Sequence, residues 1–481
     1  MYVEGLRDAS RFLEVVRKVA AKKPILAMKA GRTEEGAKAA SSHTGGIAKQ
    51  EMATDLIFEK AGILSFRDEA ELCQAGAVFA SQPVPHGNRV GVITNTGGPA
   101  VIATDALVAG GLTIPVLSEQ AKEVLTSTLF PEASIGNPLD VLATAEGKHF
   151  RAAMDTMMNE DQIDSIYINF VTAPFVNTEN IAREIVEVNR QQRKPIICNL
   201  MTDKGQWTET VRILKDGNVP IYDFPGAAAK ALAALTRYGE IRRRKTGKPK
   251  LFQDVDQWTA KTIIGQAKNA GRKTLSAAEV YGILNAYKIP VAEWRIAANA
   301  EEAERCAAEI GYPVVVKADS GSILHKSDRG GVAVNLQNDR AVRAAVNRMR
   351  KRFDTQDLKF LIQEYLPGGK EIIVGAKAEE GLGHLVMFGI GGVHVEVLQD
   401  TVFKLSPVTS AEAQEMFCSI KATPLLGAVR GKKGVDKKGV TQVIQRVSQL
   451  VTEVPGIQEM DINPIIAYED RVFAVDARIS L

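Results

Sequence analysis

Residues 24–46 read PILAMKAGRTEEGAKAASSHTGG, an apolar run followed by a segment rich in Gly, Ala, Ser and Thr. The run at 24–28 predicts a buried strand, and the segment from Gly31 to Gly46 predicts a loop that opens a helix. Such a loop offers unpaired N–H groups and the positive end of a helix dipole, which suit a phosphate. A neutral imidazole is a competent nucleophile near neutral pH, so His43 in this loop can carry a phosphoryl group. The plainer alternative is a loop histidine that hydrogen-bonds locally.

The composition around this stretch is that of an ordinary globular chain. The 481 residues are 45% hydrophobic and 24% charged, with a net charge of +3, and this length allows about three domains. The small net charge gives no reason to expect nucleic acid or a membrane surface as a partner. Four cysteines lie far apart without a CxxC pair, and neither a signal peptide nor a membrane-length apolar run is present. We therefore expect a cytoplasmic protein.

The first 82 residues predict an incomplete α/β domain. A strand at 1–3, an amphipathic helix at 9–20, the strand at 24–28 and a helix near 53–61 follow one another. Two strands are too few for a stable doubly wound sheet. We expect 1–82 to be a partial flavodoxin-like domain whose missing strands come from another chain or were lost by truncation.

Residues 87–245 alternate predicted strands and helices, which is the pattern of a parallel sheet with helices on both faces. The strand at 89–95 runs into a glycine-rich turn, TGGPA at 96–100, that begins a helix. This is again anion-binding geometry, although a tight βα turn is the plainer interpretation. The loop at 171–175 follows a strand at the edge where parallel sheets bind ligands. We expect a complete flavodoxin-like domain here and a solvated linker at 246–273.

The residues from 274 onward carry pieces of a nucleotide site. The apolar strand at 312–317 ends in Lys317, whose positive charge suits phosphate groups. The segment from Gln363 to Leu366 can present backbone groups to a base and the Glu364 carboxylate to a ribose. Together these pieces predict that residues 274–481 bind a nucleotide.

A magnesium site is predicted by three oxygen-bearing side chains near the ends of two strands, Asp461, Asn463 and Asp476. Mg²⁺ takes few carboxylates and keeps several waters beside the substrate phosphates, and this set suits that preference. Each residue type alone is common on protein surfaces, so the prediction depends on their order and spacing.

These pieces together resemble an ATP-grasp domain, and more closely that of the NDP-forming (ADP-forming) acyl-CoA synthetases, relatives of succinyl-CoA synthetase. The segment at 31–46 resembles the phosphohistidine loop of the same family. The ATP-grasp resemblance is carried by VVVKADS at 314–320, ILHKSDRGGV at 323–332, IQEYLPGGKEIIVG at 362–375, GIGGVHVE at 389–396, DINPIIA at 461–467 and VDAR at 475–478. It implies an α/β protein in which the partial and the complete flavodoxin-like domain are followed by an ATP-grasp domain at 274–481. In that family a carboxylic acid, CoA and a nucleoside triphosphate are interconverted with acyl-CoA, the diphosphate and phosphate, through acyl phosphate and phosphohistidine.

The resemblance also implies a role for each matched residue. His43 would be the phosphorylated nucleophile, oriented by the carboxylate of Glu4, and His325 the second phosphate acceptor, near the nucleotide. The nucleotide, ATP/ADP or GTP/GDP, would be held by Lys317, Gln363, Glu364, Leu366 and Glu371. The Mg²⁺ would be held by Asp461, Asn463 and Asp476.

The chain departs from the family at its start. The family normally begins with a CoA-binding domain, and no glycine-rich turn of that kind precedes residue 30. We therefore expect CoA, as a substrate, to require a separate CoA-binding domain or subunit, in a homo- or hetero-oligomer.

Two other functions compete with a ligase. One is the synthetase-like regulatory module of protein lysine acetyltransferases, which carries an added acetyltransferase domain and often lacks the reactive histidine. The other is an inactive fragment of a once-complete synthetase. This sequence keeps His43 and ends just after the magnesium motif, which favours the enzyme.

Overall fold

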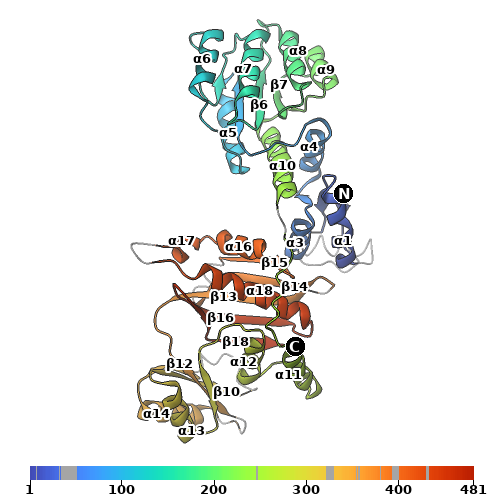
Figure 1. Cartoon of the computed structure of the whole chain (residues 1–481). Helices are drawn as coiled ribbons and strands as arrows, with labels where there is room; N and C mark the ends of the chain where they lie inside the picture. Colours follow the sequence, from blue (N-terminus) through green and yellow to red (C-terminus); the bar gives the residue numbers. More distant parts are fainter. Residues whose placement is uncertain are drawn as a thin grey trace. The chain divides into compact units, whose positions relative to one another are not determined.

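The computed structural model divides the chain into two compact units, Met1–Arg244 and Lys245–Leu481 (Figure 1). It describes residues 1–6, 8–31, 33, 51–244, 247–320, 330–353, 355, 358–379, 381–392, 400–428 and 433–481. Among the helices of these ranges, none has the length and apolar character needed to cross a membrane.

The first unit begins with a small parallel sheet in the order β1-β2-β3, formed by Tyr2–Val3, Leu26–Lys29 and Leu64–Phe66. This is one strand more than the two on which we based the expectation of a partial domain. Helices α1 (Ala9–Ala20), α3 (Glu51–Ala61) and α4 (Glu69–Ser81) accompany it. Helix α1 has the predicted bounds because Asp8 accepts a hydrogen bond from the Arg11 N–H at its start. Its Val16 packs with Ala27 and Phe58 in a small core.

The second sheet of this unit is five-stranded and wholly parallel, in the order β5-β4-β6-β7-β8. The strands are β4 (Val90–Thr94), β5 (Leu139–Asp140), β6 (Ser165–Val171), β7 (Ile196–Met201) and β8 (Ile221–Tyr222). The helices are α5 (Gly97–Ala109), α6 (Glu119–Thr128), α7 (Gly147–Asn159), α8 (Thr178–Asn189), α9 (Thr208–Asp216) and α10 (Pro225–Arg243). Two apolar cores, one on each face, bury the strands, as expected for a doubly wound domain.

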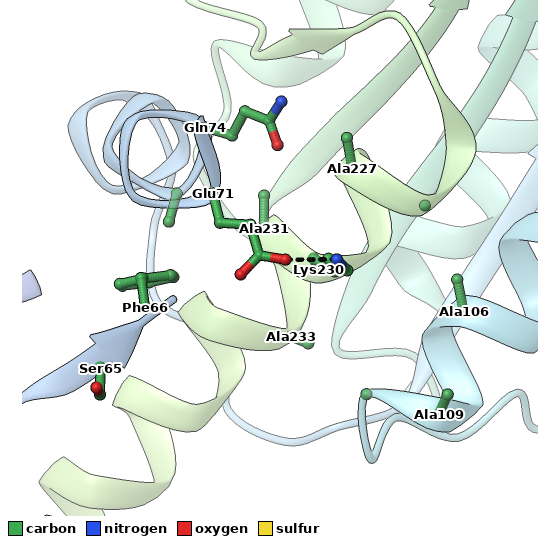
Figure 2. Close-up of a pocket in the computed structure, with 13 residues that line it drawn as sticks. Ser65, Phe66, Glu71, Gln74, Ala106, Ala109, Ala227, Lys230, Ala231 and Ala233 are labelled. Atoms are coloured by element: carbon green, nitrogen blue, oxygen red, sulfur yellow. Dashed lines mark hydrogen bonds and ion pairs between the residues drawn. The ribbon is translucent and has the colours of Figure 1, made fainter. Parts of the chain in front are cut away.

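Helices α4 and α10 connect the two sheets of the first unit. The Tyr222 hydroxyl donates a 2.8 Å hydrogen bond to the Gln74 carbonyl. Lys230 of α10 forms an ion pair with Glu71 of α4, and both line a cavity of about 420 Å³ whose other walls are largely alanine and glycine (Figure 2).

The second unit contains an antiparallel four-stranded sheet in the order β11-β10-β12-β9. The strands are β9 (Trp294–Ala297), β10 (Val314–Asp319), β11 (Val332–Leu336) and β12 (Lys359–Glu364). Helices α13 (Ala300–Ile310) and α14 (Asp339–Arg352) cover one face (Figure 1). Val316 and Ile362 point into the core beneath these helices. Side chains alternate along a strand, so Lys317 and Gln363 point to the opposite face.

A larger antiparallel sheet completes the second unit, in the order β15-β14-β13-β16-β17 with β18 also paired to β16. The strands are β13 (Lys370–Glu379), β14 (Gly383–Ile390), β15 (Thr401–Leu405), β16 (Glu459–Ala467), β17 (Val472–Ala474) and β18 (Ala477–Ser480). The helices are α12 (Ala277–Ala286), α16 (Ser410–Ser419), α17 (Thr423–Leu426) and α18 (Lys437–Glu453). Met460 and Ile462 of β16 point into the core that includes α18, so Asp461 and Asn463 point to the other face.

The segment 246–273, which the sequence predicts to be a linker, differs from that expectation because it holds helix α11 (Gln257–Asn269). Asp256 accepts a hydrogen bond from the Thr259 N–H and begins the helix. Ala260 and Ile264 belong to the core of the second unit. Small apolar residues at helical spacing therefore bind this segment to the unit that follows it.

Candidate nucleotide and magnesium site

Lys317 lies at the junction of the two sheets of the second unit. The side chain is only 8% exposed, and its Nζ donates a hydrogen bond to the Val475 carbonyl, just beyond β17. Its Nζ also lies 3.7 Å from the Asp476 Oδ1. Strand β10 thus brings the buried cation of Lys317 next to one of the predicted magnesium ligands, about 160 residues further along the chain.

The three predicted magnesium ligands lie together. Asp461 and Asn463 share one face of β16, and the Asn463 N–H donates a 3.1 Å hydrogen bond to the Asp476 carbonyl. The Asn463 Oδ1 accepts a 3.1 Å hydrogen bond from the Gly392 N–H, at the end of β14. The structure therefore assembles Asp461, Asn463, Asp476 and Lys317 from two strands and one connecting turn.

The environment of Asp461 fits a cation. Its Oδ1 is buried and makes no hydrogen bond within the described part of the chain. Burial, together with the negative charges of Asp476 and Glu459, raises the pKa of Asp461 to about 6. A buried carboxylate oxygen without a donor is costly unless a cation approaches it, and Mg²⁺ prefers such oxygen ligands. Within the described ranges no group of three or more His, Cys, Asp and Glu forms a metal cluster, and the predicted set has two carboxylates and one amide.

The predicted nucleotide-binding residues follow β12 into β13. Gln363 is 1% exposed, whereas Glu364 and Leu366 are half-buried beside it. Glu371, at the start of β13, is exposed, and its carbonyl accepts a 2.9 Å hydrogen bond from the Gly391 N–H. A Cβ at Gly392 would lie 1.9 Å from the Glu371 Oε2, so the glycine leaves room for this carboxylate.

Two aromatic residues at the site, Tyr281 and Trp294, were not predicted from the sequence. The Tyr281 hydroxyl donates a 2.8 Å hydrogen bond to the Val475 carbonyl and accepts a 3.2 Å hydrogen bond from the Gln363 Nε2. Its ring stacks on Trp294 with 5.3 Å between ring centroids. A tyrosine on a helix gives no signal of this kind in the sequence, because the contact is made with a turn 194 residues away.

The predicted phosphohistidine region is described only at its borders. His43 and His325 lie outside the described residues. Glu4 follows β1 and Lys29 ends β2, and the register pairs Val3 with Lys29. The Lys29 Nζ donates a 2.8 Å hydrogen bond to the Glu4 carbonyl. Glu4 therefore lies at the same sheet edge from which the segment carrying His43 departs.

The start of α5 offers anion-binding geometry in the same unit. Thr96 precedes the helix and makes no side-chain cap hydrogen bond to it, so the Gly97 and Gly98 amides keep donor capacity. Nearby on β6, Asn169 is fully buried, and neither its Nδ2 nor its Oδ1 has a hydrogen-bond partner among described atoms. A free helix end beside an unsatisfied buried amide can receive a phosphate.

Three family models match this arrangement of domains. They are a succinyl-CoA ligase like flavodoxin domain over residues 1–79, a Ligase-CoA domain over residues 90–243 and an ATP-grasp domain over residues 266–481. The chain belongs to the family of ADP-forming acyl-CoA ligases, and the α/β fold with an ATP-grasp domain is confirmed. The alternative of an acetyltransferase regulatory module is not favoured, because the named relatives are ligases.

The relatives make the family assignment specific. The chain is 37% identical over 98% of its length to 4-hydroxybutyrate–CoA ligase [ADP-forming] of Nitrosopumilus maritimus, covering 68% of that protein. It is 33% identical over its whole length to acetate–CoA ligase [ADP-forming] I of Archaeoglobus fulgidus, covering 69% of it. It is also 44% identical, over 46% of its length, to subunit beta of acetate–CoA ligase [ADP-forming] I of Pyrococcus furiosus, covering 97% of that subunit. Relatives of this chain thus include a subunit of a split ligase.

Proposed function

We propose that this chain carries out the phosphoryl-transfer steps of an ADP-forming acyl-CoA ligase. In the full reaction a carboxylic acid, CoA and ATP are interconverted with acyl-CoA, ADP and phosphate. The observation that carries the proposal is that Lys317 lies beside Asp476, whose backbone contacts Asn463 and whose charge acts on Asp461. The buried Asp461 Oδ1 has no hydrogen-bond donor within the described part of the chain. The relatives are named as ADP-forming ligases, which supports ADP as the nucleotide product.

In this proposal the second unit, from about residue 274, holds ATP or ADP. Lys317 exchanges its contact with the Val475 carbonyl for a phosphate oxygen by rotation of its flexible side chain. Bound Mg²⁺ neutralises phosphate charge and is held by Asp461, Asn463 and Asp476. The base and ribose are held by Gln363, Glu364, Leu366 and Glu371.

Phosphate passes through histidine in this proposal. An imidazole nitrogen of His325 attacks the γ-phosphorus of ATP, so an N–P bond forms and the P–O bond to ADP breaks. A His43 nitrogen then attacks the same phosphorus and releases His325. Finally the carboxylate of the acid attacks the phosphorus and releases His43, which yields the acyl phosphate. At His43 the carboxylate of Glu4 fixes the tautomer and stabilises the developing positive charge. The amides at the start of α5 stabilise the phosphoryl oxygens at the acyl phosphate stage.

The acyl-transfer steps need CoA, and we propose that a CoA-binding domain or subunit completes the enzyme. The first unit would then contribute the phosphohistidine domain at 1–82 and a ligase domain at 87–245. A partner that carries its own CoA site is consistent with the split ligases among the relatives.

The test is phosphorylation of the protein by labelled ATP with Mg²⁺. We expect an acid-labile, base-stable phosphoprotein that disappears in His325→Ala and is reduced in His43→Ala. Addition of acyl-CoA and phosphate should label the protein at His43 only when a CoA-binding partner is present. Equal labelling in both variants and the wild type would overturn the histidine assignments. A wild type that takes no label and binds no nucleotide would overturn the proposed function.

A further inference from the structure

The Val475 carbonyl receives two hydrogen bonds, and they come from different elements. One donor is the Nζ of Lys317 on β10, and the other is the hydroxyl of Tyr281 on α12, at 2.8 Å. Val475 is the residue before Asp476, and its own N–H donates to the Pro464 carbonyl at 3.1 Å. The carbonyl that precedes a predicted magnesium ligand is therefore held from both sides.

The two donors differ in what the proposed reaction requires of them. Lys317 must leave the carbonyl when it turns to a nucleotide phosphate. Tyr281 has no such second task, because it is 1% exposed and its ring is stacked on Trp294. Its oxygen also accepts from the Gln363 Nε2, so the hydroxyl hydrogen is directed to the Val475 carbonyl. The hydroxyl bond is the one that persists when the lysine moves.

We propose that Tyr281 is a positioning residue of the nucleotide and magnesium site: its hydroxyl holds the Val475–Asp476 turn in place while Lys317 exchanges between the Val475 carbonyl and a phosphate. The same hydroxyl links Gln363, on the base side of the site, to the turn that carries the metal ligand. This inference rests on the proposed function, because it assigns a role within that site.

The electrostatics of the site keep the hydroxyl a donor. Burial and the negative charge of Asp476 raise the pKa of Tyr281, and Asp319 adds to this rise, which the Gln363 hydrogen bond only partly opposes. The phenol therefore stays protonated throughout the neutral range. Its bond to the carbonyl is consequently independent of pH under the conditions in which the ligase would work.

The chain offers a matched control for a single-atom test. Tyr281→Phe removes the hydroxyl and keeps the ring that packs against Trp294. Tyr287→Phe removes an equally buried hydroxyl of the same unit, which donates a 2.7 Å hydrogen bond to Glu453 rather than to the site. Tyr281→Phe loses two hydrogen bonds and Tyr287→Phe loses one. The unfolding temperature of each variant therefore measures the structural cost separately from the effect on the site.

The measurement is calorimetric binding of ADP to the full chain, with and without Mg²⁺, together with the unfolding temperature. The gain is the ratio of the dissociation constants for ADP without and with Mg²⁺. For Tyr281→Phe we expect this ratio to fall roughly fivefold to tenfold, and the Mg²⁺ concentration at half-saturation to rise. For Tyr287→Phe we expect that gain to be unchanged. Binding without Mg²⁺ should change little in Tyr287→Phe. In Tyr281→Phe it should fall less than the Mg²⁺-dependent gain does, because only the partner of Gln363 is lost.

The outcomes separate the inference from the proposed function. A wild type that binds no ADP rejects the proposed nucleotide site itself. The positioning role is rejected if the wild type binds ADP more tightly with Mg²⁺ and Tyr281→Phe keeps that whole gain. It is also rejected if Tyr287→Phe loses as much of the gain as Tyr281→Phe. Should Tyr281→Phe fold poorly because the Gln363 amide loses its partner, the double variant Tyr281→Phe/Gln363→Leu removes both groups. The Mg²⁺-dependent gain, measured as a ratio, must fall in that variant too.

Discussion

Asp461 lies close enough to Asp476 for the negative charge of one to disfavour ionisation of the other. Burial is the larger cause and this charge the second, and together they raise the pKa of Asp461 to about 6. Stability alone does not favour two carboxylates in one partly buried place. Binding of a divalent cation does favour two neighbouring carboxylates, because the cation supplies positive charge between them.

Replacement of Asp461 by Asn should stabilise the unliganded protein and weaken its binding of Mg²⁺-nucleotide. The folded-state pKa of Asp461 is raised above the ordinary value of 3.8. Ionisation of Asp461 therefore costs the folded protein nothing below that value, and it lowers the free energy of unfolding as the pH rises through about 6. At pH 8 we expect Asp461→Asn to unfold with a free energy about 1–3 kcal/mol higher than the wild type. At pH 4 the two should unfold alike.

Calorimetric unfolding of the second unit at these two pH values checks the stability, and ADP titration with Mg²⁺ checks the binding. An Asp461→Asn protein that is less stable at pH 8, or that keeps the full Mg²⁺ effect, would contradict the assignment of Asp461 to a cation site.

His149 gives the first unit a pH dependence of the opposite sign. The Glu146 N–H donates a 2.9 Å hydrogen bond to the His149 Nδ1 at the start of α7, and the ring lies 4.4 Å from that of Phe130. Burial, and then the charge of Lys148, lower the pKa of His149 below its ordinary 6.5. The ring must stay neutral to accept this bond, so its stability contribution is present above pH 6.5 and is lost as the pH falls through the lowered pKa.

We therefore expect the unfolding temperature of the first unit to fall between pH 7 and pH 5 more steeply in the wild type than in His149→Gln. Glutamine at this position keeps an acceptor for the Glu146 N–H and does not titrate. Parallel pH profiles of the two proteins would show that another group is responsible. The ring contact with Phe130 is lost in His149→Gln, so the free energy of unfolding of this variant at pH 7 should be lower than that of the wild type by about 1 kcal/mol.

The sequence predicts those elements whose signals are local. Helix α1 has its predicted bounds because an aspartate cap and an apolar face coincide within twelve residues. The parallel strands at 90–94 and 165–171 are buried on both faces and read as apolar runs. Helix α11 was missed because its buried face is made of Ala260, Ile264 and Ala267, which are too few and too small to produce a strong apolar period.

The candidate site was predictable only where one strand or turn carries its own motif. Lys317 and Asp476 each follow a short apolar run in the sequence, which reveals the residue types but not the 3.7 Å between the Lys317 Nζ and the Asp476 Oδ1. Tyr281 had no such signal, since its two polar partners come from distant parts of the chain. Asn169 was missed for another reason. An asparagine inside a strand is recognisable as unusual, but its lack of a hydrogen-bond partner among the described residues is a property of the folded core.

The glycines that flank the site permit a test of Glu371 without changing it. A Cβ at Gly392 would lie 1.9 Å from the Glu371 Oε2, the free end of a flexible side chain, so Gly392→Ala should force the carboxylate to rotate away. Gly392 and Gly368 both have positive φ values, of 77° and 70°, and a Cβ at Gly368 meets no atom within 4 Å. Both alanine variants should therefore lose about 1–2 kcal/mol of stability for the backbone strain alone.

Only Gly392→Ala should also lose nucleotide affinity, by roughly tenfold, because it alone displaces Glu371, a carboxylate proposed to hold the nucleotide. ADP titration of the two variants, corrected for their stability, distinguishes these effects. Gly391→Ala provides a third comparison, since its Cβ would lie 2.7 Å from the backbone of Ile372 and the strand itself must shift. That variant should be the least stable of the three. If Gly392→Ala and Gly368→Ala bind ADP equally, Glu371 does not contribute to nucleotide binding, and the ribose must be held by Glu364 instead.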